Sequence, residues 1–500
     1  MLDVLMVTPP SRAQVYQALS NEFAAIEPPV ASGLIATYVR RAGFDVAMLD
    51  AEAEGLTHEQ TADRIAGLAP RLAVFMICGQ QPSASTQCMP GGRKACEALD
   101  ELTRGTIPTL VVGTHPSALP ERTLREEPYA YVCRGEGPVT VARLAAALKN
   151  GGDLRAVPGL WYRDADGTIR HNAPARLLDD LDDELAGQAW DLLDMSLYRS
   201  HNWHSFDKPA DRMRYASLQT SLGCPFKCSF CCINAPFGTN TLRCWSPDNV
   251  IAQIDVLVER YGIRNIKIHD EMFVLNPKHV MGIADRIIER GYDLNFWAYA
   301  RIDTLQNEAM LTRLKRAGFN WLAIGIESGS RFVRDGVTKG RFDNDSISTV
   351  IDRVRDHGIN VAANYIFGLP DDTLATMRET LDMALALNTT WANFYSAMAY
   401  PGSQLYQVAK DRGWRLPDDP GGPGWIGYSQ HAYDCLPLPT EALAATEVLA
   451  FRDAAFDEYF SNSSYLSGMR RKFGQPAVDH IHRMLKYKLP RRHRDTAAAA

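Results

Sequence analysis

The chain has 500 residues, of which 46% are apolar and 22% charged, and its formal net charge at pH 7 is −6. These proportions are ordinary for a soluble globular protein of two or more domains, and the acidic balance argues against a general nucleic-acid binder. The chain contains no apolar run of about 18 residues, so we expect no membrane-spanning helix. The N-terminus, MLDVLMVTPP, lacks the pattern of a signal peptide. We therefore expect a cytoplasmic protein without nucleic-acid or membrane partners.

Strand and helix patterns alternate over residues 1–148. Helical patterns cover Gly33–Arg41 and Thr57–Leu68. Helical patterns such as these separate apolar runs typical of buried strands, at Val4–Val7, Val46–Leu49, Leu72–Ile77, Thr109–Val112 and Ala130–Cys133. The alternation predicts a doubly wound parallel sheet, which binds ligands at the carboxyl ends of its strands. We expect the loops at that edge to be Thr8–Arg12, Cys78–Thr86, Gly113–Ser117 and Arg134–Gly137.

Residues 149–205 form a predicted linker. Asp166 and Gly167 lie between two short alternating runs, a pattern typical of a hairpin turn. The acidic run LLDDLDDE that follows is typical of a solvated surface stretch.

Four of the ten cysteines lie within nine residues. Cys224, Cys228 and Cys231 have the spacing C-x-x-x-C-x-x-C, and Cys232 follows directly. Tyr215–Leu222, just before them, is a predicted strand. Thiolates this close together bind a soft metal centre in a reducing compartment. Three of them can hold three irons of a four-iron cluster and leave the fourth iron open to a small molecule.

Two alternatives remain for this cluster. Cys232 in place of Cys231 gives the spacing C-x-x-x-C-x-x-x-C. A structural zinc site is the other, and it requires four ligands around one ion, with Cys232 as the fourth.

Residues 206–405 repeat a strand–helix pattern. Predicted helices begin after the cap residue Ser246 and cover Glu308–Ala317 and Ser346–His357; the predicted strands are Asn265–Ile268, Trp321–Ile326 and Val361–Phe367. Successive units of this size build a parallel barrel or part of one, with its chemistry at the carboxyl ends of the strands. Residues 406–500 change to loops and two helical stretches, Thr440–Phe460 and Ala477–Lys488.

The cysteine spacing and the units that follow resemble the radical S-adenosylmethionine (SAM) superfamily. The segments PPVASGLIATYVRRAGFDV, GTHPSALPE and VCRGEGP resemble the cobalamin-binding domain that precedes the radical SAM core in the class B methyltransferase-like subfamily. The resemblance implies an α/β protein with a Rossmann-like domain, a partial (β/α)6 barrel and a helical C-terminal region that caps the substrate. An N-terminal domain that has lost its cofactor is the alternative.

The chain departs from one cobalamin motif. D-x-H-x-x-G is absent after the first strand, where the loop reads TPPSRAQ. The string Asp50–Gly55 has the spacing, but it has Glu52 for the histidine and follows the second strand, so we interpret it as coincidence. A bound cobalamin would then have no lower histidine ligand.

The resemblance also implies site residues, although no catalytic residue. Asp270 and Glu271 would bind the SAM amino group, and Arg301 the SAM carboxylate. The other SAM contacts would be Glu327, Ser328, Phe367, Gly368 and Leu369. The cobalamin contacts would be Ser83, Ser85, Gly113, His115, Pro116, Gly135 and Glu136. Each pattern alone is also typical of an ion pair or a turn.

The implied enzyme reduces a [4Fe-4S] cluster with an external flavodoxin- or ferredoxin-type donor and forms a 5′-deoxyadenosyl radical. With cobalamin, it would methylate an unactivated carbon of a small specialised metabolite. A non-methylating enzyme on the same domains is the alternative, such as an apramycin-type dehydratase, an oxidoreductase or a ring-rearranging enzyme. A zinc-stapled binding protein is the third hypothesis.

Overall fold

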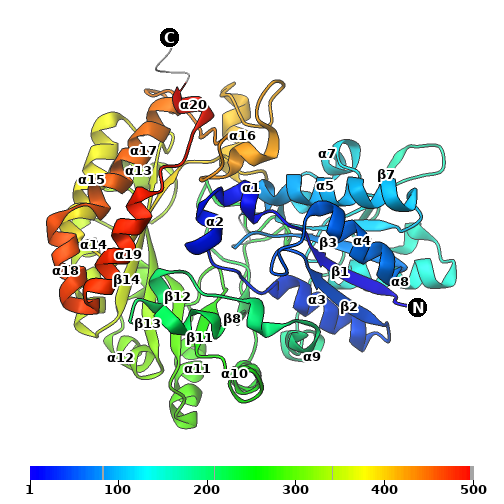
Figure 1. Cartoon of the computed structure of the whole chain (residues 1–500), viewed down its shortest axis with the longest axis horizontal. Helices are drawn as coiled ribbons and strands as arrows, with labels where there is room; N and C mark the ends of the chain where they lie inside the picture. The colour runs from blue at the N-terminus through cyan, green and yellow to red at the C-terminus, as the bar shows by residue number, and fades with distance from the viewer. Residues whose placement is uncertain (81–83, 208, 341, 496–500) are drawn as a thin grey trace.

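Two β-sheets, each flanked by helices, lie side by side, and a helical region follows them in the chain (Figure 1). The computed structural model describes residues 1–80, 84–207, 209–340 and 342–495. Within these ranges, no helix combines the length and the apolar character needed to cross a bilayer.

The N-terminal sheet has the predicted parallel core. Its spatial order begins with β2 (Val46–Asp50), β1 (Val4–Thr8), β3 (Leu72–Ile77), β4 (Thr109–Gly113) and β5 (Tyr131–Cys133), all parallel. The predicted hairpin then adds β6 (Leu160–Arg163) and β7 (Ile169–His171) as antiparallel strands at one edge. The expected α/β class is confirmed, and part of the predicted linker extends this sheet.

Successive residues of the central strands enter two separate cores, as the period of two requires. Leu5, Val7 and Phe75 pack on one face, which is covered by α4 (His58–Leu68) and α5 (Ser85–Thr103). Val4, Met6 and Val74 pack on the other, which is covered by α3 (Val30–Arg41) and α8 (Pro138–Asn150). The sheet is therefore buried on both faces, as in doubly wound folds.

Two local expectations were wrong. Gly113–Ser117 is not a loop, because Thr114–Ala118 forms the short helix α6 directly after β4 and α7 (Pro120–Glu126) follows. Tyr215–Leu222 is not one strand. It divides into β8 (Tyr215–Leu218) and β9 (Ser221–Leu222), and β9 pairs with β10 (Arg243–Cys244) away from the main sheet. The chain turns between β8 and β9 and so directs the cysteine loop away from the sheet.

The second sheet is an open, six-stranded, fully parallel part of a barrel. Its order is β8, β11 (Asn265–Ile268), β12 (Asn295–Arg301), β13 (Phe319–Glu327), β14 (Asn360–Phe367) and β15 (Trp391–Ser396). Its connecting helices are α10 (Pro247–Tyr261), α11 (Pro277–Arg290), α12 (Glu308–Arg316), α14 (Asn344–Asp356) and α15 (Leu374–Leu387). The predicted partial barrel is confirmed.

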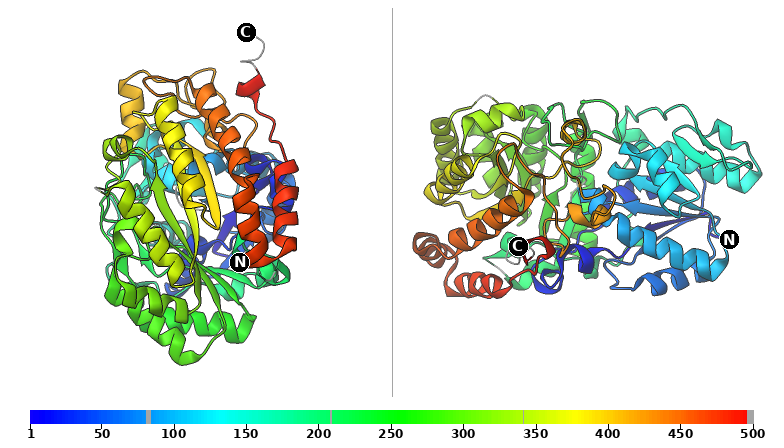
Figure 2. Two further views of the ribbon diagram at one scale, coloured as in Figure 1. Left: turned by 90° about the vertical axis from the view of Figure 1, so that its left-hand side faces the viewer. Right: turned by 90° about the horizontal axis from the view of Figure 1, so that it is seen from above.

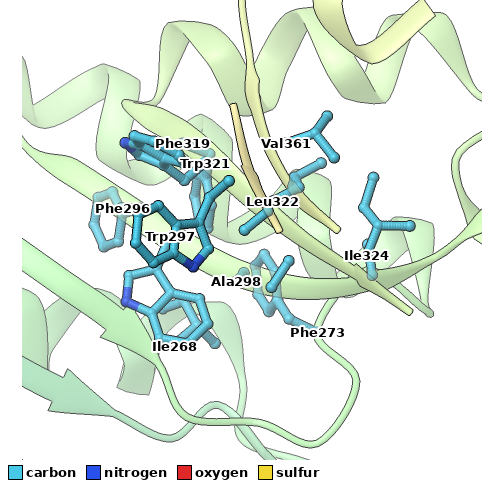
Figure 3. Close-up of a cluster of buried hydrophobic side chains, with 14 of the residues drawn as sticks. Ile268, Phe273, Phe296, Trp297, Ala298, Phe319, Trp321, Leu322, Ile324 and Val361 are labelled. Carbon is cyan, nitrogen blue, oxygen red and sulfur yellow. The ribbon is translucent and has the colours of Figure 1, made fainter. Parts of the chain in front are cut away.

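Aromatic and aliphatic side chains of this sheet pack into a buried core (Figure 3). Phe319 stacks on Phe296 and on Phe273, with ring centroids 4.7 Å and 5.2 Å apart. The alternate residues of β12, such as Trp297 and Tyr299, point to the inner face and line a cavity. The core thus fixes the strands whose other face forms the site.

The C-terminal region packs against the far edge of the barrel sheet. It comprises α16 (Gln404–Asp411), α17 (Ala445–Phe460), α18 (Ser463–Phe473), α19 (Gln475–Lys486) and α20 (Arg492–Asp495). α17 contacts β14 and β15, and Figure 2 shows α17 to α19 beside that edge. The first two helices of the chain, α1 (Arg12–Tyr16) and α2 (Leu19–Glu22), lie between the two sheets in Figure 1.

A buried charge network joins the two sheets. Glu27, just before α3, accepts hydrogen bonds from the Tyr215 hydroxyl (2.7 Å) and from Ser217, both on β8. Lys267 of β11, fully buried, pairs with Glu27 at 3.3 Å and donates to the Gln80 carbonyl at 2.6 Å. Because an unpaired buried charge is strongly unfavourable, this pair fixes how the sheets meet.

We expect Lys267→Ala to lower the free energy of unfolding by about 3–5 kcal/mol, because it leaves the Glu27 carboxylate buried and uncompensated. Guanidinium denaturation followed by circular dichroism measures the change. Arg286→Ala, which breaks an exposed pair with Asp248, is the matched control and should change little. Equal effects of the two variants would contradict the role given to the network.

Candidate active site

Two cavities meet where the carboxyl edges of the sheets face each other. The N-terminal cavity, about 180 Å³, lies at the ends of β1, β3, β4 and β5. The barrel cavity, about 550 Å³, lies inside the open barrel and beneath the C-terminal region. Tyr16, Gln80, Gln87, Ile233 and Glu271 line both. Ligands in the two cavities would therefore share one wall.

The cysteine loop is held rigidly at this junction. The Cys224 amide donates to the Asn234 side-chain oxygen (3.2 Å), and the Asn234 side chain donates to the Cys224 carbonyl (2.8 Å). The Cys231 amide donates to the Cys228 carbonyl (3.0 Å), which closes a tight turn. Gly223 precedes the loop at φ +84°, and a Cβ there would meet the Thr241 carbonyl at 2.4 Å. Only glycine fits this position.

The two adjacent cysteines differ in their surroundings. Cys231 lines the barrel cavity, and its pKa is raised by burial and further by the neighbouring thiols of Cys232, Cys228 and Cys224. Cys232 is buried beside Gly402, whose Cβ position lies 3.7 Å from the Cys232 Cβ. The geometry therefore favours Cys231 as the third cluster ligand.

The adjacent carboxylates at the end of β11 have different partners. Asp270 is fully buried and accepts hydrogen bonds from the Thr220 amide and hydroxyl (2.6 Å each) and from the Ser221 hydroxyl (2.7 Å). Glu271 lines both cavities, and its Oε2 is buried without a hydrogen-bond partner among the described residues. Burial raises the pKa of Glu271 to about 8. Glu271 is thus available to a ligand, whereas Asp270 braces the chain before the cysteines.

Arg301, at the end of β12, lies against the cysteine loop. Its guanidinium stacks 3.7 Å from the Phe226 ring centroid and donates to the Cys228 sulfur at 3.7 Å. It also forms a two-point pair with Asp303, at 2.9 Å for both bonds. Arg301 therefore places a buried positive charge beside the Cys228 sulfur.

The end of β13 combines a strained residue with an ion pair. Glu327 has φ +68°, rare outside glycine, and it pairs with Lys339 at 2.5 Å on the barrel cavity wall. Ser328 is buried and shares a hydrogen bond of 3.1 Å with the Thr380 hydroxyl. Ser328 does not line the barrel cavity, whereas Glu327 and Lys339 do.

The segment after β14 is only partly directed to the cavity. Leu369 lines the barrel cavity. Phe367 stacks on Phe394 and packs edge-on against Phe451 of α17, so its side chain is not on the lining. Gly368 has φ +80°, and a Cβ there would meet Val448 of α17 at 2.4 Å. Phe367 and Gly368 therefore join the strand to the C-terminal region.

Three of the expected cobalamin residues, Gly113, Gly135 and Glu136, line the N-terminal cavity. A Cβ at Gly113 would meet the Ile77 carbonyl at 2.4 Å, so the backbone of β4 approaches β3 closely there. Glu136 pairs with Arg243 of β10 at 2.7 Å and so ties this cavity to the barrel domain. Ser83 lies outside the described residues.

The remaining three expected cobalamin residues are buried beside this cavity and do not line it. Ser85 donates to the Ile77 carbonyl (2.5 Å) and accepts from the His115 amide (3.1 Å). The His115 ring shares a hydrogen bond of 3.1 Å with the Thr86 hydroxyl and packs edge-on against Trp425. Pro116 lies in the same helix, α6. Their side chains brace the fold around the cavity.

Several cavity residues were missed from the sequence. Glu52, interpreted as coincidence, lines the N-terminal cavity and accepts from the Ser11 and Arg12 amides at 2.6 Å and 2.8 Å. Lys339 was missed because its partner Glu327 is twelve residues away. The inward side chains Asn364 and Asn393 of the barrel, which are bonded to each other at 2.8 Å, were missed too. The sequence signal that could have identified the two asparagines is the alternation of inward and outward side chains along β14 and β15.

The residues present fit the implied cofactors. No three His, Cys, Asp or Glu side chains in the described ranges converge on a single ion. A cubane instead takes each thiolate on a different iron, so its ligands stand further apart than those of one zinc ion. Cys231 lines the barrel cavity, and so does Glu271, whose Oε2 is buried without a partner among the described residues and suits an amino group. The glycine-lined edge of the N-terminal sheet suits a large planar ligand approached by the backbone.

Comparison with known families separates the same two domains. Residues 16–145 match the B12 binding domain, and residues 218–384 match the radical SAM superfamily. An uncharacterized methyltransferase of Pyrococcus horikoshii is 30% identical over 82% of this chain and 83% of its own length. The anaerobic magnesium-protoporphyrin IX monomethyl ester cyclase of Rubrivivax gelatinosus is 26% identical over 79% of this chain and 69% of its own.

A solved structure has the same fold along the whole chain. The radical SAM methyltransferase TsrM of Kitasatospora setae superposes with a TM-score of 0.68 at 18% identity, covering 99% of each chain. The expected cofactors, a [4Fe-4S] cluster, SAM and cobalamin, are those of the family defined by the two domains. The chain belongs to the radical SAM enzymes that carry an N-terminal B12-binding domain.

Proposed function

We propose that the chain is a cobalamin-dependent radical SAM methyltransferase that methylates an unactivated carbon of a small specialised metabolite. The shared wall of the two cavities, formed around Tyr16 and Glu271, carries this proposal. It lets a cofactor held by the N-terminal domain face a substrate held in the barrel. The relative from Pyrococcus horikoshii is named as a methyltransferase, which supports methyl transfer.

When bound, the cluster, SAM and cobalamin supply hydrogen abstraction and the methyl group. The chain's own residues hold and shield them. Cys224, Cys228 and Cys231 would hold the cluster, and Glu271 would accept hydrogen bonds from the SAM amino group. Arg301 supplies positive charge beside Cys228. The electron donor is external, of the flavodoxin or ferredoxin type.

The spacing that suggested an apramycin-type dehydratase requires Cys232. Cys232 is buried beside Gly402, whereas Cys231 lines the barrel cavity. This arrangement favours the common spacing over the spacing of the apramycin-type dehydratase.

Two measurements on anaerobically reconstituted protein test the function. Cobalamin should stay with the protein through gel filtration. Incubation with SAM, a reductant and a cognate substrate should give S-adenosylhomocysteine and 5′-deoxyadenosine together, as expected for methyl transfer. Loss of cobalamin, or 5′-deoxyadenosine alone, would contradict methyl transfer and favour the non-methylating alternative.

The paired cysteines provide a matched test of the cluster. We expect Cys231→Ala to lose most of the iron and sulfide and all SAM cleavage, because a cluster iron loses its thiolate. Cys232→Ala should keep both. Iron and sulfide analysis with electron paramagnetic resonance of the reduced protein measures this. Loss of the cluster in Cys232→Ala, with the cluster retained in Cys231→Ala, would make Cys232 the ligand.

Glu271 gives a pH prediction. With its pKa raised to about 8, the carboxyl is largely protonated at pH 7 and becomes a charged acceptor only as the pH rises. SAM affinity should therefore increase between pH 6 and 8, by up to about tenfold per unit.

Calorimetric titration of SAM at pH 6, 7 and 8 measures this slope. Glu271→Gln should reduce the slope and the proton release on binding. The exposed Glu289→Gln on α11 is the control. Any titration of SAM itself is common to all three proteins, so an unchanged slope in Glu271→Gln would exclude the contact.

A further inference from the structure

The barrel cavity contains a second polar cluster, contributed by the C-terminal region. Arg452 of α17 and His431 lie on the cavity wall with Asp453 and Ser396. We call these four residues the arginine site. The Arg452 Nε donates to the Phe394 carbonyl of β15 at 2.7 Å, so the guanidinium is fixed to the sheet.

Together with the neighbouring Arg491, the arginine site carries one uncompensated positive charge. Asp453 is shared between Arg452, at 2.9 Å, and the fully buried Arg491, at 3.1 Å. Other charged groups on the cavity wall are paired, Glu327 with Lys339 at 2.5 Å and Asp457 with Lys488 at 2.6 Å. Glu271 is assigned to SAM. Two guanidinium groups therefore share one carboxylate in the part of the chain that the structure describes.

This excess charge is largely removed from water. The Arg452 side chain is 8% exposed, and the Arg491 side chain is 1% exposed. The Nη1 of Arg491 donates hydrogen bonds to the carbonyls of Gln430 and Ala432. The Nη2 of Arg452, in contrast, donates no hydrogen bond to any described residue. A buried, unmatched cation is unfavourable, and an anionic ligand offsets this penalty.

Neutral hydrogen-bonding groups accompany the charge. The Ser396 hydroxyl is buried and without a partner among the described residues, and so is the Nδ1 atom of His431. Burial, followed by the nearby Arg452 and Arg491, lowers the pKa of His431 well below its usual range, so this ring is neutral. A planar anion at Arg452 would find further partners in these two groups.

The rest of the barrel cavity is strongly aromatic. Trp203, Trp297, Trp391 and Phe456 line it, and the Arg452 guanidinium lies 5.6 Å from the Phe456 ring centroid. Such walls bind an apolar or planar molecule, and a few fixed polar groups orient it. The single excess charge matches a monoanion.

We propose that the substrate is a small molecule with an apolar, planar body and a carboxylate, and that Arg452 binds this carboxylate. The proposal rests on the methyltransferase function proposed above and adds the substrate class. Arg452 is then a specificity-determining residue, distant in sequence from every cofactor-binding motif of the chain.

Calorimetry with two matched probes tests the proposal on the intact protein. The protein is reconstituted with cluster and cobalamin and saturated with SAM without reductant, so that the SAM carboxylate site is filled. We expect 3-phenylpropionate to bind at least about tenfold more tightly than 3-phenylpropionamide, because charge-assisted hydrogen bonds are the stronger ones. Equal or weaker binding of the carboxylate overturns the proposal, and this comparison needs no variant.

Arg452→Gln should abolish the preference for the carboxylate and leave SAM affinity unchanged. Arg378→Gln is the control, since Arg378 is a half-exposed arginine on α15 that pairs with Glu458. A fall in SAM affinity with the preference retained would assign Arg452 to SAM and overturn the proposal. Absence of S-adenosylhomocysteine in the product assay, with the preference intact, would refute methyl transfer and leave the carboxylate site standing.

Discussion

The Asp270 carboxylate is the contact on which the site depends. It joins the end of β11 to the turn between β8 and β9 through three hydrogen bonds of 2.6–2.7 Å from Thr220 and Ser221. Burial raises the pKa of Asp270 to about 6 although these donors oppose the shift. Because this turn leads directly into Cys224, the same contact sets where the thiols lie relative to the barrel.

The junction between the two sheets encloses the cavities beside which the cysteine loop lies. The Glu27–Lys267 pair and the Glu136–Arg243 pair both cross from the N-terminal domain to the barrel domain. The C-terminal region meets the first helix as well, since Gln17 donates to the His431 carbonyl at 2.6 Å. Three segments distant in sequence therefore enclose one pair of cavities, and neither domain alone would form the wall around Glu271.

Local sequence patterns predicted the fold well because the strands are strongly apolar and the helix boundaries are marked. Ser246 caps α10, as the sequence indicates, and Gly262 ends the helix at φ +63°. The β8–β9 turn was missed because the run Tyr215–Leu222 has no glycine or proline. The turn depends on Asp270, some fifty residues away, and the local sequence around the turn cannot predict such a long-range contact.

The site was predictable only where motif and chemistry coincide. The cysteines were identifiable by spacing, but the different roles of Asp270 and Glu271 follow from tertiary partners that adjacent residues cannot reveal. His115 and Phe367 matched family segments, yet their side chains pack against Trp425 and Phe451. Arg452 had no sequence signal, because its charge matters only where Arg491 and Asp453 meet it.

A crystal structure of the chain loaded with cobalamin and SAM tests the central claim most directly. The account predicts the corrin along Gly113 and Gly135, with one face toward Tyr16 and Glu271, and a cubane held by Cys224, Cys228 and Cys231. A corrin bound elsewhere, or a cubane with a fourth protein ligand, would contradict it.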